Sequence, residues 1–247
     1  MMMNRIIHGD CLEVLPKLPR AKMIFADPPD NLGMKYNGFE DRWPSDASYI
    51  KWLADVTDAG CKRSCVFWLS YYWKWDFALK GRLYAENVDH WRDIKPYVWW
   101  FTFGQHRETD NGSCFRPLLR FSVPSTKWQA DAIREPSARQ REYDDSRADP
   151  RGRVPGDVWD GVWKESRVCG TFKEKRKWHL NQHPEALLER IVKFSAKPGD
   201  LVIDLFGGTF TTARVCQRLG IDCISIEISE SYCRKGAEEL GVEVEVL

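Results

Sequence analysis

Paired cysteines at short spacing are missing from this chain of 247 residues. None of its eight cysteines forms a C-x-x-C pair, and the closest two, Cys61 and Cys65, have three residues between them. C-x-x-C pairs are typical of structural zinc sites and redox motifs, so we expect no structural metal. Free thiols in turn favour a reducing, cytoplasmic location.

Long apolar runs and a strong net charge are lacking as well, and we expect no secretory leader. No stretch approaches the ~20 apolar residues of a membrane span, so we expect no membrane partner. The formal net charge of +1 gives no overall sign of a nucleic acid partner. The length suits one large α/β domain with an insertion or two small domains, and we predict a single domain over residues 1–247.

The C-terminal third has the pattern of a strand, a glycine turn, a helix and a second strand. The strands are predicted at 201–205 and 222–228, and the second carries Glu227, 23 positions after Asp204. An acid at this spacing can reach the ribose hydroxyls of a bound nucleoside. The G-x-G-x-x-G sequence of pyrophosphate sites is absent, so we expect a nucleoside without phosphates.

A second motif follows the strand predicted at 21–26, which ends at Asp27-Pro28-Pro29-Asp30. Proline has no N–H and a fixed φ, so the loop offers the Pro28 carbonyl beside the Asp27 carboxylate as two aimed acceptors. Two acceptors match the two hydrogens of an exocyclic NH2 and would draw its nitrogen toward a nucleophilic, tetrahedral state. A Pro-Pro turn that only ends a strand is the alternative interpretation.

Five stretches in a fixed order carry a resemblance to a known family: residues 8–13, 27–30, 181–191, 204–209 and Glu227. They resemble the β-class S-adenosylmethionine-dependent methyltransferases that modify exocyclic amino nitrogens in DNA. Because the catalytic loop precedes the cofactor glycines, the motif order is a circular permutation of the usual methyltransferase order. The resemblance implies a Rossmann-like α/β fold with a mostly parallel central sheet.

The resemblance also implies roles for individual residues. Catalysis would fall to Asp27, Pro28, Pro29 and Asp30. The S-adenosylmethionine site of the family corresponds to Asp10, Cys11, Asp27, Gln182, His183, Asp204, Phe206, Gly207, Gly208, Thr209, Thr211, Thr212 and Glu227.

Some of these residues also have plain structural interpretations. Asp10 would meet the adenine of the cofactor, but it is also a turn residue after a glycine. Gln182 and His183 would lie against the cofactor's amino acid, but polar residues before Pro184 also cap helices. Thr209 would help to bind a carboxylate at a helix N-terminus, or it would only cap that helix.

The fourth residue of the catalytic loop departs from the family, which has an aromatic residue where this chain has Asp30. An aromatic ring there would stack on the target base, which must be flipped out of the duplex before its amine can be reached. We expect the stacking to come from Tyr36, Tyr72 or Trp73; otherwise the acceptor is not an ordinary base in duplex DNA. Two adjacent carboxylates should also raise the pKa of one member of the Asp27 and Asp30 pair.

The middle of the chain is rich in charge and proline. Residues 122–155 contain seven basic residues, six acidic residues and four prolines. We predict a target-recognition insertion at about 104–160, in which Arg139, Arg141 and Arg151 reach phosphates and guanine edges. A solvated, flexible loop is the alternative.

These patterns predict methyl transfer from S-adenosylmethionine to an exocyclic amino nitrogen of double-stranded DNA. Adenine N6 is favoured, because an Asp at the head of the catalytic loop resembles the adenine enzymes and a Ser there the cytosine N4 enzymes. The alternatives are cytosine N4, RNA or a modified base as acceptor, and an inactive regulator that keeps the fold and binds DNA. A homodimer and a restriction-modification partner are both compatible with the family, and the sequence decides neither.

Overall fold

The computed structural model describes residues 4–85, 93–101, 107–159, 168 and 172–247. In this part of the chain the strands are β1 (Asn4–His8), β2 (Ala21–Ala26), β3 (Lys35–Tyr36), β4 (Phe39–Glu40), β5 (Ser64–Ser70), β6 (Asp93–Trp100), β7 (Phe115–Ser122), β8 (Val158–Trp159), β9 (Leu201–Asp204), β10 (Asp222–Glu227) and β11 (Val244–Val246). The α-helices are α1 (Cys11–Val14), α2 (Asp46–Arg63), α3 (Asp76–Ala85), α4 (Ala138–Arg141), α5 (Glu185–Ser195), α6 (Thr211–Leu219) and α7 (Glu230–Leu240). Short 3-10 helices lie at Leu15–Lys17, Trp73–Trp75 and Ala130–Ile133.

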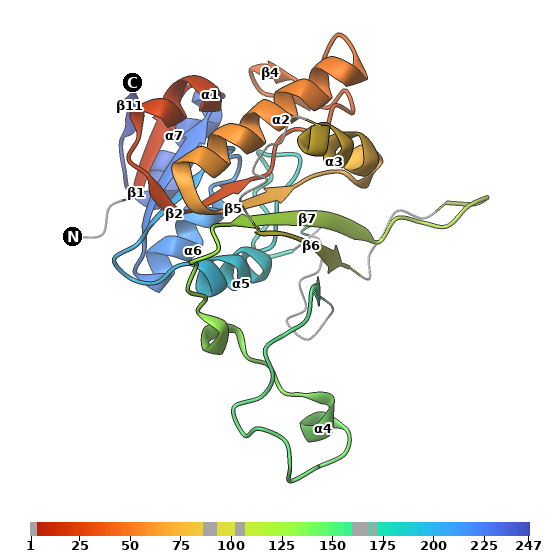
Figure 1. Ribbon diagram of the computed structural model, residues 1–247. Coiled ribbons are helices and arrows are strands. Elements are labelled where there is room, and N and C mark those ends of the chain that lie inside the picture. The colour runs from red at the N-terminus through yellow and green to blue at the C-terminus, as the bar shows by residue number, and fades with distance from the viewer. Residues whose placement is uncertain (1–3, 86–92, 102–106, 160–167, 169–171) are drawn as a thin grey trace.

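The main sheet has the strand order β11-β1-β10-β9-β2-β5-β7-β6-β8 (Figure 1). Its strands run parallel to their neighbours except for β7, which is antiparallel to both β5 and β6. The predicted α/β fold with a mostly parallel central sheet is therefore confirmed.

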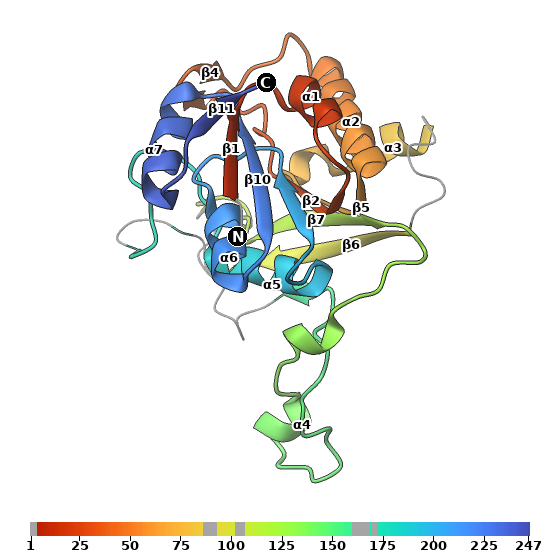
Figure 2. The same ribbon diagram turned by 90° about the vertical axis from the view of Figure 1, so that its left-hand side faces the viewer.

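Helices cover both faces of the sheet, with α1, α2 and α3 on one side and α5, α6 and α7 on the other (Figure 2). Successive strand residues point to opposite faces. In β2, Met23 and Phe25 accordingly pack in the core with α5 and α6, whereas Ile24 and Ala26 pack in the core with α2. A nearly continuous apolar run is typical of a strand buried on both faces of a sheet. Residues 21–26 have this pattern, interrupted only by Lys22 near its start.

The neighbouring strands β2 and β9 bring the two ends of the chain together. Met23 pairs with Val202 and Phe25 with Asp204, and the Leu205 N–H donates to the Phe25 carbonyl at 3.0 Å. Parallel strands end at the same edge of a sheet, so the loop after β2 lies beside the glycine turn after β9. This adjacency allows the permuted order of the motifs to build one site.

An arm formed by residues 134–153 projects away from the sheet and carries α4 (Figure 2). At its root Glu135 and Arg153 exchange backbone hydrogen bonds of 2.9 and 2.8 Å, and their side chains form an ion pair of 2.7 Å. Gly152 is required there, because its φ is +83° and a Cβ would lie 2.3 Å from the Glu135 carbonyl oxygen. The interval 104–160 also contains β7 and β8, so the segment that leaves the sheet is shorter than the predicted insertion.

No helix in the described residues is both long and apolar enough to cross a membrane.

Candidate active site

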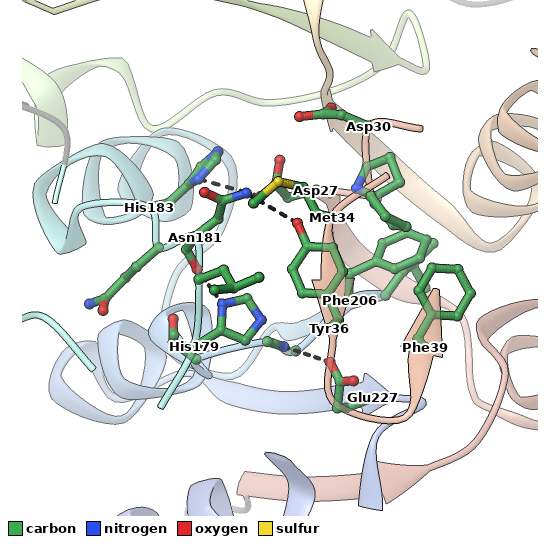
Figure 3. A pocket seen from close by; sticks show the side chains of 18 of the residues that line it. Asp27, Asp30, Met34, Tyr36, Phe39, His179, Asn181, His183, Phe206 and Glu227 are labelled. Atoms are coloured by element: carbon green, nitrogen blue, oxygen red, sulfur yellow. Dashed lines mark hydrogen bonds and ion pairs between the residues drawn. The ribbon is translucent and has the colours of Figure 1, made fainter. Parts of the chain in front are cut away.

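A cavity of about 650 Å³ lies at the ends of β2, β9 and β10. In open α/β sheets, ligands bind outside the carboxyl ends of the strands. Every residue predicted for catalysis or for the cofactor lines this cavity, as do Tyr36 and Tyr72. Asp27 and His183 lie at one end and Glu227 at the other, with Tyr36 and His179 between them (Figure 3).

At the far end, Glu227 holds the glycine turn in place. Its Oε2 accepts the Gly208 N–H at 2.8 Å, and its Oε1 accepts the Ser229 N–H at 2.8 Å. Burial raises the pKa of Glu227 above its ordinary value, although these backbone N–H groups oppose the rise. Each carboxylate oxygen has a second lone pair, so Glu227 can still accept two hydroxyl groups from a ligand.

The glycine turn packs too closely for side chains. Gly208 has a φ of +51°, and a Cβ there would lie 3.4 Å from Nε2 of His179. A Cβ on Gly207 would lie 2.7 Å from the Phe210 ring. Phe210 itself is the N-cap of α6, with a φ of +56° and no side-chain cap. The interpretation of Thr209 as the cap of this helix is therefore wrong.

The segment at 179–183 closes one wall of the cavity. Gln182 accepts the Arg176 N–H at 2.8 Å and donates to the Glu174 carbonyl at 2.7 Å. The N-cap of α5 is Pro184, without a side-chain cap, so the capping interpretation of Gln182 and His183 is wrong. His183 instead faces the catalytic loop, with Nδ1 3.4 Å from Oδ2 of Asp27.

Asp10 is a turn residue that also lines the cavity. Its Oδ1 accepts the Leu12 N–H at 2.7 Å and caps α1, as a turn residue would. The same residue lines the cavity beside Cys11. Capping thus fixes the Asp10 side chain without removing it from the site.

Two aromatic side chains fix the backbone of the catalytic loop. The Tyr49 hydroxyl donates to the Pro29 carbonyl at 2.9 Å, and the Trp75 indole donates to the Asp30 carbonyl at 2.8 Å. Within the described residues nothing donates to the Pro28 carbonyl, which leaves it available to a ligand. Tyr49 lies on α2 and Trp75 in the 3-10 helix at Trp73–Trp75, so no local sequence pattern connects either residue with the loop at 27–30.

Arg116 is a side chain at the candidate site that sequence reasoning missed. It reaches the catalytic loop from β7 and donates to Asp27 Oδ1 at 2.9 Å and to Asp30 Oδ2 at 2.8 Å. Its Nε also donates to Ser70 Oγ at 2.6 Å. The available signals were an arginine in a mostly apolar stretch, which also contains Arg120, and an unusual second aspartate in the loop at 27–30.

Arg116 changes the electrostatics expected for the two aspartates. Burial alone would raise the pKa of Asp27, but the nearby His183 and Arg116 outweigh burial and hold the pKa below its ordinary value. The expectation that two adjacent carboxylates raise the pKa of one of them does not hold for Asp27. A guanidinium between two carboxylates replaces their repulsion by attraction.

The three aromatic candidates for base stacking differ in whether they line the cavity. Tyr36 lines the cavity, and its hydroxyl accepts a hydrogen bond of 3.1 Å from Nδ2 of Asn181. Tyr72 also lines the cavity, whereas Trp73 is exposed and does not. Arg139, Arg141 and Arg151 lie on the arm and are likewise outside the cavity.

Comparison with known proteins places this site in a family. A model of DNA methylases, named N6_N4_Mtase, matches residues 21–239. DNA adenine methyltransferase YhdJ of Escherichia coli K12 is 33% identical, over 96% of this chain and 82% of the relative. The type II methyltransferase M.BglII of Bacillus subtilis is 27% identical, over 93% of this chain and 67% of the relative.

Solved structures agree on the fold. The PvuII cytosine-N4-specific DNA methyltransferase superposes with a TM-score of 0.70 at 17% identity, covering 95% of this chain and 85% of that one. A complex of M1.HpyAVI with SAM gives a TM-score of 0.61 at 19% identity, covering 96% of this chain and all of that one. The resemblance seen in the motifs is thus confirmed, and the chain belongs to the N6/N4 family of DNA methylases.

Proposed function

We propose that this protein transfers a methyl group from S-adenosylmethionine to N6 of adenine in double-stranded DNA. The observation that carries the proposal is the single cavity with Asp27 and the free Pro28 carbonyl at one end and Glu227 at the other. Such a cavity can hold a cofactor that contains a nucleoside, with the reactive group of the cofactor directed at the acceptor amine. The identity of 33% to a DNA adenine methyltransferase favours adenine over cytosine.

The residues at the far end fit the proposed cofactor. Glu227 keeps free lone pairs for a ribose diol, and the bare backbone of Gly208 lets a ligand approach closely. When bound, S-adenosylmethionine supplies an electrophilic methyl group. The protein itself places the acceptor amine in line with that methyl group and excludes water.

Asp27 and Pro28 would stabilise the charge that develops on the amine. Methyl transfer would place positive charge on the amine nitrogen, and the proton that this nitrogen then loses would pass to solvent. The Asp27 carboxylate and the Pro28 carbonyl accept the two N–H groups and favour that charged state over the neutral amine. Because the pKa of Asp27 is lowered, it stays a carboxylate at neutral pH.

The proposed function is tested by incubating the protein with S-adenosylmethionine labelled in its methyl group and with unmethylated genomic DNA or total RNA. We expect label in the DNA. Label in RNA alone would move the activity to another acceptor. Tight cofactor binding without any incorporation would favour a regulator that keeps the fold.

The cofactor end gives one quantitative prediction. Replacing Gly208 by valine adds a branched side chain at a positive φ, and replacing Glu227 by alanine leaves the Gly208 N–H and two ribose hydroxyls unpaired. Each change should weaken S-adenosylmethionine binding by at least ~1–3 kcal/mol, measured by calorimetry. Gly81→Ala is the matched control, because a Cβ there meets nothing within 4 Å. Affinity unchanged in both site variants would place the cofactor elsewhere.

We also propose that the arm reads DNA. Its arginines at 139, 141, 147 and 151 are exposed, and three of them pair with acids of the same segment at 2.8–3.9 Å. Exposed ion pairs contribute only ~0–1 kcal/mol, so these arginines can exchange their partners for phosphates at little cost. The ion pairs at the root meanwhile keep the arm in one place.

Neutralising Arg139, Arg141 and Arg151 together should weaken duplex binding and lower its salt dependence. Each lost phosphate contact lowers the slope of log K against log salt by ~0.9, so we expect a fall of up to ~2.7. Binding titrations at several salt concentrations measure the slope. The control neutralises Lys51, Lys62 and Arg234, which are exposed and paired with acids on α2 and α7. Equal slopes of log K against log salt for the two triple variants would show that the arm is a solvated loop.

A further inference from the structure

Where the family has an aromatic residue, this protein has Asp30, which forms an ion pair with Arg116. Arg116 donates from Nη1 to Asp30 Oδ2 at 2.8 Å and from Nη2 to Asp30 Oδ1 at 2.9 Å. A bidentate guanidinium–carboxylate pair is planar and geometrically specific. Both side chains line the cavity while remaining mostly buried, with 15% of Arg116 and 13% of Asp30 exposed. Asp30 lies at the same end of the cavity as Asp27 (Figure 3).

The other donors of Arg116 are also used. Its Nε donates to Ser70 Oγ at 2.6 Å, and the second hydrogen of Nη2 goes to Asp27 Oδ1 at 2.9 Å. Four of the five N–H groups of the guanidinium are therefore directed at protein atoms. A guanidinium in this state meets a ligand through its flat face or through the last Nη1 hydrogen.

Building on the proposed DNA methylation, we propose that the planar pair of Arg116 and Asp30 is the surface on which the extruded target base stacks. Arg116 contacts the base, because guanidinium planes stack on nucleobases as aromatic rings do. Asp30 is a positioning residue that holds the plane. Its negative charge also balances Arg116, so that no net positive charge opposes the ammonium developing beside Asp27.

Phe115 is the rival for this role. It precedes Arg116 in β7, is 39% exposed and lines the same cavity. Neighbouring residues of a strand point to opposite sides, so one base cannot use both side chains in the same way. Comparison of the two positions therefore shows whether Arg116 or Phe115 makes the stacking contact.

The test compares two DNA duplexes in the presence of S-adenosylhomocysteine. One carries the adenine that the wild-type protein methylates, and the other is abasic at that position. Arg116→Lys keeps the charge and loses the plane, so it should weaken binding of the complete duplex by about 5- to 100-fold and that of the abasic duplex by less than about twofold. Unchanged S-adenosylhomocysteine affinity confirms that the variant is folded.

A purely structural role of Arg116 would give equal losses on the two duplexes, and this result would overturn the inference. So would a base-dependent loss with Phe115→Leu that Arg116→Lys does not show. The proposed function is tested separately, because methylation by the wild-type protein locates the target adenine before any variant is compared.

The positioning role of Asp30 has its own readout. Asp30→Ala should reproduce the base-dependent loss when Arg116 is present and add almost nothing in the Arg116→Lys background. Losses that simply add in the double variant would show that the two residues act independently.

Discussion

Replacing Asp27 by alanine should lower the rate of methyl transfer by at least about 10²–10³-fold while leaving cofactor affinity nearly unchanged. Loss of one preorganised group that stabilises transition-state charge costs about this much in other enzymes. Asp27 lies at the end of the cavity opposite to Glu227, so we expect its partner to be the acceptor amine. Single-turnover rates with saturating cofactor measure the first quantity, and calorimetry measures the second.

Asp55→Ala is the matched control for this variant. Asp55 is an acid on α2 that pairs with Lys51 on the surface, and its side chain is 45% exposed. It should transfer methyl groups at the wild-type rate. Near wild-type turnover in the Asp27 variant would remove this carboxylate from the mechanism.

Replacing Arg116 by glutamine should shift the acid limb of the pH–rate profile upward. In the proposed mechanism the active form of Asp27 is the carboxylate, and Arg116 is one of the groups that hold its pKa below the ordinary value. Loss of the guanidinium raises this pKa, because the positive charge that favours the carboxylate is removed. Activity should therefore fall most at low pH and recover in part as the pH rises.

Asp30→Asn should not shift the acid limb of the pH–rate profile upward. It removes a negative charge near Asp27, so the acid limb should move to lower pH or stay in place. Profiles of kcat/KM over pH 5–9 report the free enzyme and separate the two directions. A loss of activity in Arg116→Gln that is the same at every pH would show that Arg116 does not set the charge state of Asp27.

The sequence alone predicts those parts of the fold and of the candidate site that contiguous residues form. The strand 21–26 and the Asp27-Pro28-Pro29-Asp30 loop are contiguous, and so is the glycine turn that follows β9. Their residue types carry their own geometry, because proline fixes φ and glycine admits positive φ. Every cofactor residue inferred from these motifs lines the cavity.

The sequence failed where the site depends on which strands are neighbours. Arg116 reaches Asp27 and Asp30 only because β7 lies antiparallel beside β5, with Ser70 opposite Leu118. No local pattern reveals that pairing. Trp73 was misjudged for a similar reason, since the chain turns into a 3-10 helix at Trp73–Trp75 and leaves Tyr72 at the cavity.

Nucleoside analysis of DNA methylated by the wild-type protein tests the central claim most directly. DNA from a strain without adenine or cytosine methylation is treated with the protein and S-adenosylmethionine, digested to nucleosides and examined by mass spectrometry. We predict N6-methyladenosine as its deoxy form, absent when Asp27→Ala replaces the wild-type protein. N4-methylcytosine instead would overturn the assignment of the base, and no methylated nucleoside from active, cofactor-binding protein would contradict the proposed catalysis.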